Sequence, residues 1–426
     1  MGLRTIRFSL VMLICLCILA SVTTSMASDI DNIRFDINTK GLPVVEPAKV
    51  GVSAEKLGEI RTVLQGYVDN GNLPGFLTVI ARKGQIVHFE TIGMQDVENK
   101  KPVEPDTIFR IYSMSKPITS VAVMILWDDG KFKLDDPVEK FIPAFKDMKV
   151  YNSEQTETHD AKTKMTIKHL LTHTSGLTYG WGNKPVDKRY GEIKVFNKGS
   201  TLAEMAEKLG DIPLVHEPGT RWTYGVSTDV LGYLVEVVSE MPFETFLQKR
   251  LFEPLGMHDS AFSVPKENVD RFAALYRPTQ EGKLQLARNA PLATDDLSFF
   301  PSGGGGLVST AADYLRFCQM LLNGGELDGV RILKSETVEL MRYPHHQYRE
   351  NGAFGLGFHV VTRKNEGEAR RSSGAYSWSG AAATTFWIDP DKELVAILMT
   401  QLLNNRYPFH GEFRSLTYQA LEDKEK

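Results

Sequence analysis

Cysteine is scarce in this sequence, with three residues among 426. Cys15 and Cys17 lie in the apolar N-terminal segment, and neither follows a small residue of the kind that precedes a lipid-modified cysteine. We therefore expect no lipid attachment at either position. Cys318 alone follows, in a segment with helical periodicity. Because one cysteine cannot form an internal disulfide, we predict that Cys318 is a buried apolar residue.

The sequence also has little excess of one charge over the other and few long apolar runs. The formal net charge is −4, and lysine and arginine form no dense cluster. This argues against nucleic acid or an anionic membrane surface as a partner. After the N-terminal segment no apolar run is long enough to cross a bilayer. The apolar fraction of 42% and the charged fraction of 24% are typical of a soluble globular protein, and the length allows a large core.

Several catalytic and cofactor motifs are missing. The sequence has no Gly-x-Ser-x-Gly element, which weighs against an α/β-hydrolase with a Ser-His-Asp triad. The four glycines 303–306 lack the spacing and the Lys-Ser/Thr of a phosphate loop, so we expect them to let the backbone pass beneath a site. His173 is interpreted as a buried hydrogen-bonding residue, and His345 and His346 as loop surface. No His, Cys and Asp grouping has zinc spacing, so we predict no metal and no cofactor.

The first 27 residues have the features of a secretory signal peptide. Arg4 and Arg7 form a basic start, an apolar core follows, and residues 25–27 (Ser-Met-Ala) offer small side chains for cleavage. The alternative is an uncleaved anchor, for which the apolar core is short. Cleavage near Ser28 would make the chain two units more negative and leave an exported protein, periplasmic or secreted, without stable membrane insertion.

The remaining chain has strand patterns at its two ends and helical patterns in its middle. Residues 28–49 are predicted to be a mobile lead-in, followed by one unit over 50–426. We expect an α+β fold in which an antiparallel sheet, from about 50–112 and 300–420, is flanked by helices. The segment of about 113–299 is a mostly helical insertion. Within it, 151–164 is expected to be a surface insertion and 180–200 a long loop, while 378–388 is expected to be one strand.

Ser113 and Lys116 are the central candidates for catalysis. They are three residues apart and would share one face of a helix. A neighbouring base activates a serine hydroxyl, and a desolvated lysine can be that base. The apolar stripe behind Lys116 predicts a buried helix, with Pro117 early enough to be tolerated. Ser113 would then lie at the N-terminal end of this helix, where free N–H groups favour negative charge.

The Ser-x-x-Lys spacing alone is weak, because it recurs at two other places. Ser53 precedes Lys56 at the start of a charge-rich helical segment and is interpreted as an N-cap. Ser263 precedes Lys266 with a proline between them, in a loop-like context. Only Ser113 combines a strand-like approach with a long apolar helix.

Two later stretches strengthen the hypothesis for Ser113. Tyr224 lies in a loop directly before a helix, where its phenol could relay the serine proton; the alternative is a packed loop tyrosine. At residues 378–381 (Trp-Ser-Gly-Ala), Gly380 permits close approach of a substrate. The N–H of Ala381 could pair with that of Ser113 as an oxyanion hole. The alternative there is a plain strand with a packed tryptophan.

With these segments in order, the chain resembles the serine β-lactamase-like family. That family includes class C β-lactamases, D-alanyl-D-alanine peptidases and family VIII carboxylesterases. The resemblance runs from about residue 50 to 401. It is carried by residues 113–116 (Ser-Met-Ser-Lys), 167–177 (Ile-Lys-His-Leu-Leu-Thr-His-Thr-Ser-Gly-Leu), 217–219 (Glu-Pro-Gly) with Trp222 and Tyr224, 252–257 (Phe-Glu-Pro-Leu-Gly-Met), 302–307 (Ser-Gly-Gly-Gly-Gly-Leu), 354–357 (Phe-Gly-Leu-Gly) and the last strands.

The resemblance implies the β-lactamase and penicillin-binding transpeptidase fold, with Ser113 as nucleophile, Lys116 as base and Tyr224 as the tyrosine of the Tyr-x-Asn element. The chain departs from the family pattern at two positions. Val226 replaces the asparagine that binds an acylamino group. Trp378 replaces the lysine of Lys-Thr-Gly, so a substrate carboxylate loses a charge-assisted bond worth roughly 1.5–3 kcal/mol. An indole can instead form the wall of an apolar ester pocket.

These departures favour an exported serine carboxylesterase acting on a small-molecule ester or amide. The residues expected to bind substrate are Trp378, Ser379, Gly380, Val226 and Trp181, the last in an aromatic loop with Tyr179. One alternative keeps the fold and assigns β-lactam or D-alanyl peptide chemistry. Another is a non-catalytic binding or assembly member. The sequence does not indicate the natural substrate or the oligomeric state.

Overall fold

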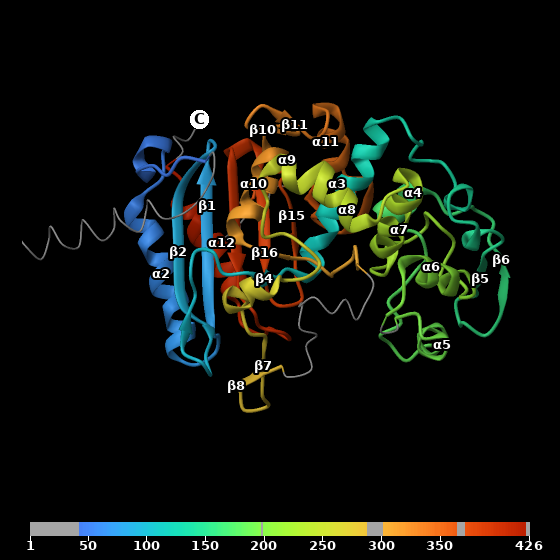
Figure 1. The fold of residues 1–426 in the computed structure, drawn as a ribbon, viewed down its shortest axis with the longest axis horizontal. Helices are drawn as coiled ribbons and strands as arrows, with labels where there is room; N and C mark the ends of the chain where they lie inside the picture. The colour runs from blue at the N-terminus through green and yellow to red at the C-terminus, as the bar shows by residue number, and fades with distance from the viewer. Residues whose placement is uncertain (1–41, 197–198, 288–300, 364–370, 423–426) are drawn as a thin grey trace, which may run out of the picture. The chain divides into compact units, whose positions relative to one another are not determined.

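A central antiparallel sheet is built from both ends of the chain, which confirms the expected α+β class. The computed structural model describes residues 42–196, 199–287, 301–363 and 371–422, and those from Val45 onward form one compact unit (Figure 1). The sheet has the order β12-β13-β14-β15-β16-β17-β1-β2-β3. Its strands are β1 (Gly75–Arg82), β2 (Gln85–Asp96), β3 (Lys101–Pro102), β12 (His346–Arg349), β13 (Gly352–Phe354), β14 (His359–Val361), β15 (Tyr376–Ser379), β16 (Thr385–Asp389) and β17 (Leu394–Met399).

The strand β1 joins the two ends of the chain. It pairs with β2 through a tight turn in which Lys83 and Gly84 have φ of 54° and 71°, as a two-residue hairpin turn requires. On its other edge β1 pairs with β17, in a register that puts Leu77 opposite Met399. Every residue of β1 and β17 is buried. Because both faces are covered, these two strands are continuous apolar runs and not alternating ones.

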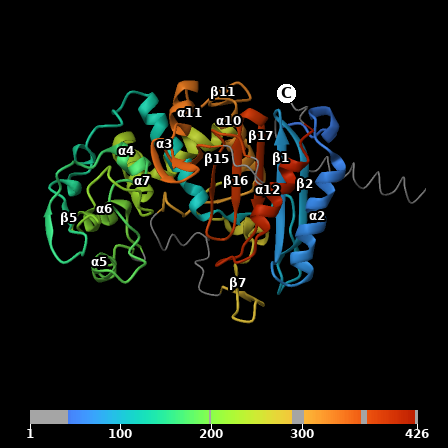
Figure 2. The ribbon, with the colours of Figure 1, turned by 180° about the vertical axis from the view of Figure 1, so that it is seen from behind.

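Two helices from opposite ends of the chain cover one face of the sheet. These are α2 (Ala54–Asp69) and α12 (Phe409–Gln419), which pack against each other, and α12 is in front of the sheet in Figure 2. Their buried residues form one cluster with alternate residues of the strands: Leu57, Ile60, Leu64, Phe76, Ile80, Trp387, Leu394, Ala396, Leu398, Phe409, Phe413 and Tyr418. Ser53 caps α2 by accepting a hydrogen bond from the N–H of Lys56, which confirms its structural role.

One buried helix packs on the sheet, and two other helices pack against each other. The helix α10 (Ala311–Leu322) packs on β17, β1 and β16 and is in front of the sheet in Figure 1. Cys318 of this helix is fully buried, as predicted. The helix α3 (Ser115–Asp128) packs against α7 (Ser227–Ser239), and its residues 115–126 are all buried. Because these residues are buried on every side of α3, its first turn is held in place by packing.

Short elements make up the rest of the chain. The helical region also contains α4 (Ile167–Leu171), α5 (Pro185–Ile193), α6 (Leu202–Gly210), α8 (Phe243–Leu247), α9 (Glu253–Leu255) and the pair β5 (Lys149–Tyr151) and β6 (Thr158–Asp160). Elsewhere lie α11 (Ser335–Arg342) and three small pairs: β4 (Phe109–Arg110) with β9 (Val308–Ser309), β7 (Tyr276–Pro278) with β8 (Leu284–Leu286), and β10 (Glu326–Leu327) with β11 (Val330–Arg331).

The structure differs from the sequence predictions in local elements. The expected loop 180–200 contains α5, because Pro185 suits the first turn of a helix. The expected single strand 378–388 is two strands, β15 and β16, joined by a turn. The end of the predicted lead-in forms a 3₁₀ helix, Pro47–Val50. The predicted signal peptide lies outside the described residues. Within the described ranges no helix combines the length and apolarity of a membrane span.

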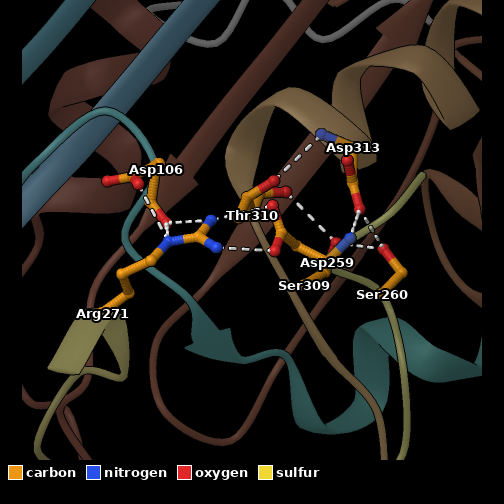
Figure 3. Close-up of polar contacts among 7 residues, drawn as sticks. All are labelled: Asp106, Asp259, Ser260, Arg271, Ser309, Thr310 and Asp313. Carbon is orange, nitrogen blue, oxygen red and sulfur yellow. Dashed lines mark hydrogen bonds and ion pairs between the residues drawn. The ribbon is translucent and has the colours of Figure 1, made fainter. Parts of the chain in front are cut away.

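A buried polar network joins the start of α10 to the preceding strand and to a distant loop (Figure 3). The carboxylate of Asp313 accepts hydrogen bonds from the N–H of Asp259 at 2.8 Å and the hydroxyl of Ser260 at 2.9 Å. Ser260 also contacts the hydroxyl of Ser309 at 2.8 Å. Arg271 binds Asp259 through both of its terminal nitrogens, each at 2.8 Å. These bonds fix the distant loop at Asp259 and Ser260 to the start of α10.

We predict that Asp313→Asn makes stability less dependent on pH. Burial raises the pKa of Asp313 to about 6. A carboxyl group with a raised folded-state pKa stabilises the fold below its unfolded pKa, and this contribution is lost as the pH rises through 6. The amide is neutral throughout. Relative to the parent, the variant should therefore gain stability between pH 4 and pH 7, by at most about 3 kcal/mol.

Urea unfolding of both proteins at several pH values measures this difference. Asp391→Asn is a matched control, because Asp391 is exposed. A parent-minus-variant difference that stays constant from pH 4 to pH 7 would contradict the assignment.

Candidate active site

Ser113 lies at the junction between a short strand and the buried helix α3. The chain leaves β4, passes through a single 3₁₀ turn (Tyr112–Met114) and enters α3 at Ser115. The helix therefore begins two residues later than expected, and Lys116 is its second residue. Tyr112 has φ of 43°, a left-handed conformation that is uncommon for a non-glycine residue. This turn presents the partly exposed Ser113 side chain beside Lys116.

The ammonium group of Lys116 is buried among oxygen atoms. Its Nζ donates to the carbonyl of Gly304 at 2.5 Å, to the hydroxyl of Tyr179 at 2.8 Å and to the Oγ of Ser113 at 3.2 Å. The residue is 1% exposed. Burial alone would lower the pKa of Lys116, but Tyr179, Tyr224 and Asp229 outweigh it and raise that pKa. Lys116 is therefore held as a cation in the resting site.

Tyr224 also contacts the hydroxyl of Ser113, although it lies more than a hundred residues further along the chain. Its phenol donates to the Oγ of Ser113 at 2.7 Å, and the Nζ of Lys116 is 4.7 Å from the centre of its ring. The loop that carries it is held by the N–H of Thr223, which donates to the carbonyl of His173 at 2.8 Å. The structure thus brings together the three side chains expected to carry catalysis.

Asp229 acts indirectly on this cluster. It is the third residue of α7, 2% exposed, and it accepts hydrogen bonds from the hydroxyl of Ser302 and, at 3.1 Å, from the N–H of Gly304. Burial raises the pKa of Asp229, against the effect of the nearby Lys116 charge. A Cβ at Gly304 would lie 2.5 Å from the Asp229 carboxylate. The glycine run therefore lets the backbone approach Asp229 and turn a carbonyl toward Lys116.

The segment 378–381 forms a wall beside the nucleophile. Trp378 packs against Tyr224 at 5.7 Å and against Phe354 at 5.2 Å between ring centres. Ser379 is exposed, and its hydroxyl contacts that of Thr385 at 2.9 Å. A Cβ at Gly380 would lie 2.4 Å from the carbonyl oxygen of Ile111. Glycine is therefore required for this turn to rest on the chain two residues before Ser113.

Trp181 and Val226, both predicted to bind substrate, have different environments. Trp181 stacks on Tyr179, with ring centres 4.1 Å apart and planes 5° from parallel, and it is 77% exposed. It therefore lies next to the ring whose hydroxyl binds Lys116. Val226 is 0% exposed, because it packs in the core at the start of α7. Its position does not support a direct contact with substrate.

Further aromatic rings pack against Tyr224 and against one another. Trp222 stacks on Tyr348 with ring centres 4.5 Å apart. His173 packs against Tyr224 at 5.2 Å. Burial lowers the pKa of His173 well below its usual value, and Lys116 adds to this effect. Its Nε2 lies 3.5 Å from the Thr228 hydroxyl, and its Nδ1 has no partner among the described residues, so His173 is a neutral packing residue with one long contact.

The prediction that His345 and His346 are loop surface is wrong for His346, whereas His345 lies in a loop but is partly buried. His346 begins β12, and the ring of His345 contacts the carbonyl of Leu340 at 2.9 Å. Alternation along the short edge strand is too brief to be recognised from the sequence. The sequence also did not predict that Tyr179, Asp229 and the carbonyl of Gly304 surround Lys116. For Asp229 a signal exists, because a carboxylate at the start of an otherwise apolar helix face needs a buried partner.

The chain is similar to known proteins over most of its length. The sequence profile of the family described as Beta-lactamase matches residues 60–418. Protein Rv1367c of Mycobacterium tuberculosis is 36% identical over 352 residues, covering 78% of this chain and 87% of that protein. Esterase EstB of Burkholderia gladioli is 28% identical over 382 residues, covering 84% and 93%. The solved structure of EstCE1, "a hydrolase with promiscuous acyltransferase activity", has a TM-score of 0.75 and 25% identity, covering 87% of this chain and 99% of that one.

We predict that Tyr179→Phe changes the pH dependence of Ser113 reactivity. Removing the hydroxyl takes away one group that raises the pKa of Lys116, so Lys116 should lose its proton at lower pH. The same change removes a hydrogen bond that positions Nζ, and the maximal rate should fall roughly tenfold. Labelling of Ser113 by a fluorophosphonate across pH 6–10 measures both effects. Tyr343→Phe, at an exposed position, is the control. An unshifted pH curve would contradict the role of Tyr179.

Proposed function

Because the chain belongs to the β-lactamase family of serine hydrolases, we propose that it is an exported carboxylesterase that forms an acyl-enzyme on Ser113. The observation that carries this proposal is the convergence of Lys116 and Tyr224 on one serine oxygen, at 3.2 and 2.7 Å. The family match agrees with the resemblance seen in the sequence. The basic and apolar start of the chain supports export.

The proposed reaction begins with attack by the Oγ of Ser113 on the ester carbonyl carbon. For this step, one of the two groups, Lys116 or Tyr224, must already have lost its proton. It then accepts the serine proton and returns it to the departing alkoxide. The oxyanion would lie between the N–H groups of Ser113 and Ala381. Water, deprotonated by the same pair, would release the acid and regenerate Ser113.

The residues around the nucleophile support ester substrates over β-lactams or D-alanyl peptides. Trp378 packs against Tyr224, where the family's lysine would bind a carboxylate. Val226 is apolar and buried, so no side-chain amide is available at that position for an acylamino group. A neutral small-molecule ester needs neither contact. Trp378, Ser379 and Gly380 would line its pocket, and Trp181 would lie at its edge.

Acyl transfer to an alcohol is a second candidate function. The acyl-enzyme would be the same, and an alcohol would replace water in the second step. Aromatic rings on two sides of Tyr224 support this candidate, because an apolar wall favours an organic acceptor over water. EstCE1, which shares this fold, is described as combining hydrolase and acyltransferase activity.

We predict that a short nitrophenyl ester acylates the protein at Ser113 and that Ser113→Ala gives no adduct. Intact-mass measurement after brief incubation detects the added acyl group. A chromogenic cephalosporin, tested in parallel, should turn over far more slowly than the ester. Fast cephalosporin turnover with inert esters would contradict the ester preference. If no acyl donor, fluorophosphonate or boronate reacts with Ser113, the chain is a non-catalytic member of the family.

We predict that Trp378→Lys shifts selectivity toward substrates with a carboxylate. The ammonium group would supply the missing charge-assisted hydrogen bond, raising the ratio of cephalosporin to ester kcat/KM roughly tenfold. Trp378→Phe keeps the apolar wall and serves as the matched control, for which the ratio should stay near that of the parent. A ratio that rises equally in both variants would mean that loss of the indole, and not the new charge, is responsible.

A further inference from the structure

The turn that carries Ala381 is fixed from outside by the C-terminal helix. His410 is the second residue of α12, and its Nε2 lies 2.7 Å from the carbonyl oxygen of Ala383. Because a carbonyl oxygen can only accept, Nε2 must carry the hydrogen. The ring is partly buried and packs edge-on against Phe409, with ring centres 4.6 Å apart. The imidazole is therefore held in one orientation, directed at the turn.

The backbone conformation of this turn is one that requires support from outside. Ala383 has φ of 63°, a left-handed conformation that costs a non-glycine residue roughly 1–2 kcal/mol. Such a conformation persists only where surrounding bonds fix it. Within the turn, the N–H of Gly380 donates to Thr384 at 2.8 Å and the N–H of Ala383 donates to Gly380 at 3.0 Å. From outside the turn, the N–H of Leu402 donates to the carbonyl of Ala382 at 3.0 Å. The bond from His410 adds a second external anchor one residue later, because it determines where the Ala383 carbonyl points.

The rest of the turn points toward the nucleophile. Gly380 packs on the carbonyl of Ile111, as its close approach requires. Ala382 and Ala383 are buried, whereas Ala381 is exposed. Among the residues that the structure describes, the N–H of Ala381 donates to no other protein group. This amide is consequently free to bind a substrate oxygen, and its direction depends on how firmly the turn is held.

We propose that His410 is a positioning residue that holds the oxyanion donor of Ala381 in place through its hydrogen bond to the carbonyl of Ala383. This inference rests on the acyl-enzyme function proposed above, in which Ala381 stabilises the tetrahedral intermediate. His410 touches neither substrate nor Ser113 in this role. It connects α12, which belongs to the sheet side of the fold, to the geometry of the reaction centre (Figure 2).

A pair of unbranched substitutions separates the hydrogen bond from packing. In His410→Met the donor is lost and the chain length is kept, whereas His410→Gln keeps an N–H that can reach the carbonyl. With a nitrophenyl ester, we expect kcat to fall roughly 10- to 100-fold in the methionine variant, with KM nearly unchanged. The glutamine variant should recover most of the loss. A purely structural role would lower thermal stability in both and leave kcat per folded molecule intact.

Thr417→Val is the control for general disturbance of α12. Its hydroxyl donates to the carbonyl of Phe413 within the helix at 2.7 Å and does not reach the turn. This variant should keep the parent kcat. If it loses as much kcat as the methionine variant, or if methionine and glutamine variants have equal kcat, the inference is overturned.

Amide hydrogen exchange gives a readout that does not need turnover. The amides of residues 380–384 should exchange faster in His410→Met than in the parent, and His410→Gln should restore their protection. If the parent forms no acyl adduct but this pattern is seen, the proposed function fails while the positioning of the turn stands. If the parent is acylated and exchange is equal in all variants, the positioning role fails while the proposed function stands.

Discussion

A buried ammonium group is the constraint on which the site depends. Burying a charge is costly unless hydrogen bonds compensate it, and Lys116 has three oxygen acceptors within 3.2 Å. Two of these acceptors, Tyr179 and Gly304, are provided by segments that must meet accurately for the cation to be tolerated. Gly304 is in turn fixed by Asp229. The cost of burying the charge therefore restricts where these loops can lie. As a consequence, Lys116 and the segments around it are held beside Ser113.

The chain path explains how distant segments supply this cluster. Both ends of the chain build the sheet, and β1 pairs directly with β17. The turn after β15 lies at the backbone before Ser113, while α7 packs along α3 and brings Tyr224 to the same place. The reaction centre thus lies where the helical region meets the sheet. Each side is held by its own packing, because residues 115–126 of α3 and all residues of β1 and β17 are buried.

Local signals made part of this arrangement predictable. The spacing of Ser113 and Lys116, with the apolar stripe behind them, is sufficient to predict a buried helix and two neighbouring side chains, although Ser113 itself lies in the 3₁₀ turn before α3. Tyr224 is identified by its motif before a helix. The contacts of Tyr179 and the turn at Ala383 could not be predicted, because they depend on tertiary pairing and on a left-handed alanine that its sequence does not indicate. Val226 illustrates the same limit, since a motif position says nothing about burial.

The charge already present at Lys116 also bears on the substrate. Its hydrogen bonds are directed at Ser113, Tyr179 and Gly304, so this cation is not available to neutralise a carboxylate elsewhere in the pocket. Where the family has a second cation, this chain has the apolar ring of Trp378. A carboxylate bound there would lose water without gaining a partner, at a cost of roughly 1–3 kcal/mol or more. An uncharged ester avoids this cost, so the electrostatics of the site and the shape of its aromatic wall favour the same class of substrate.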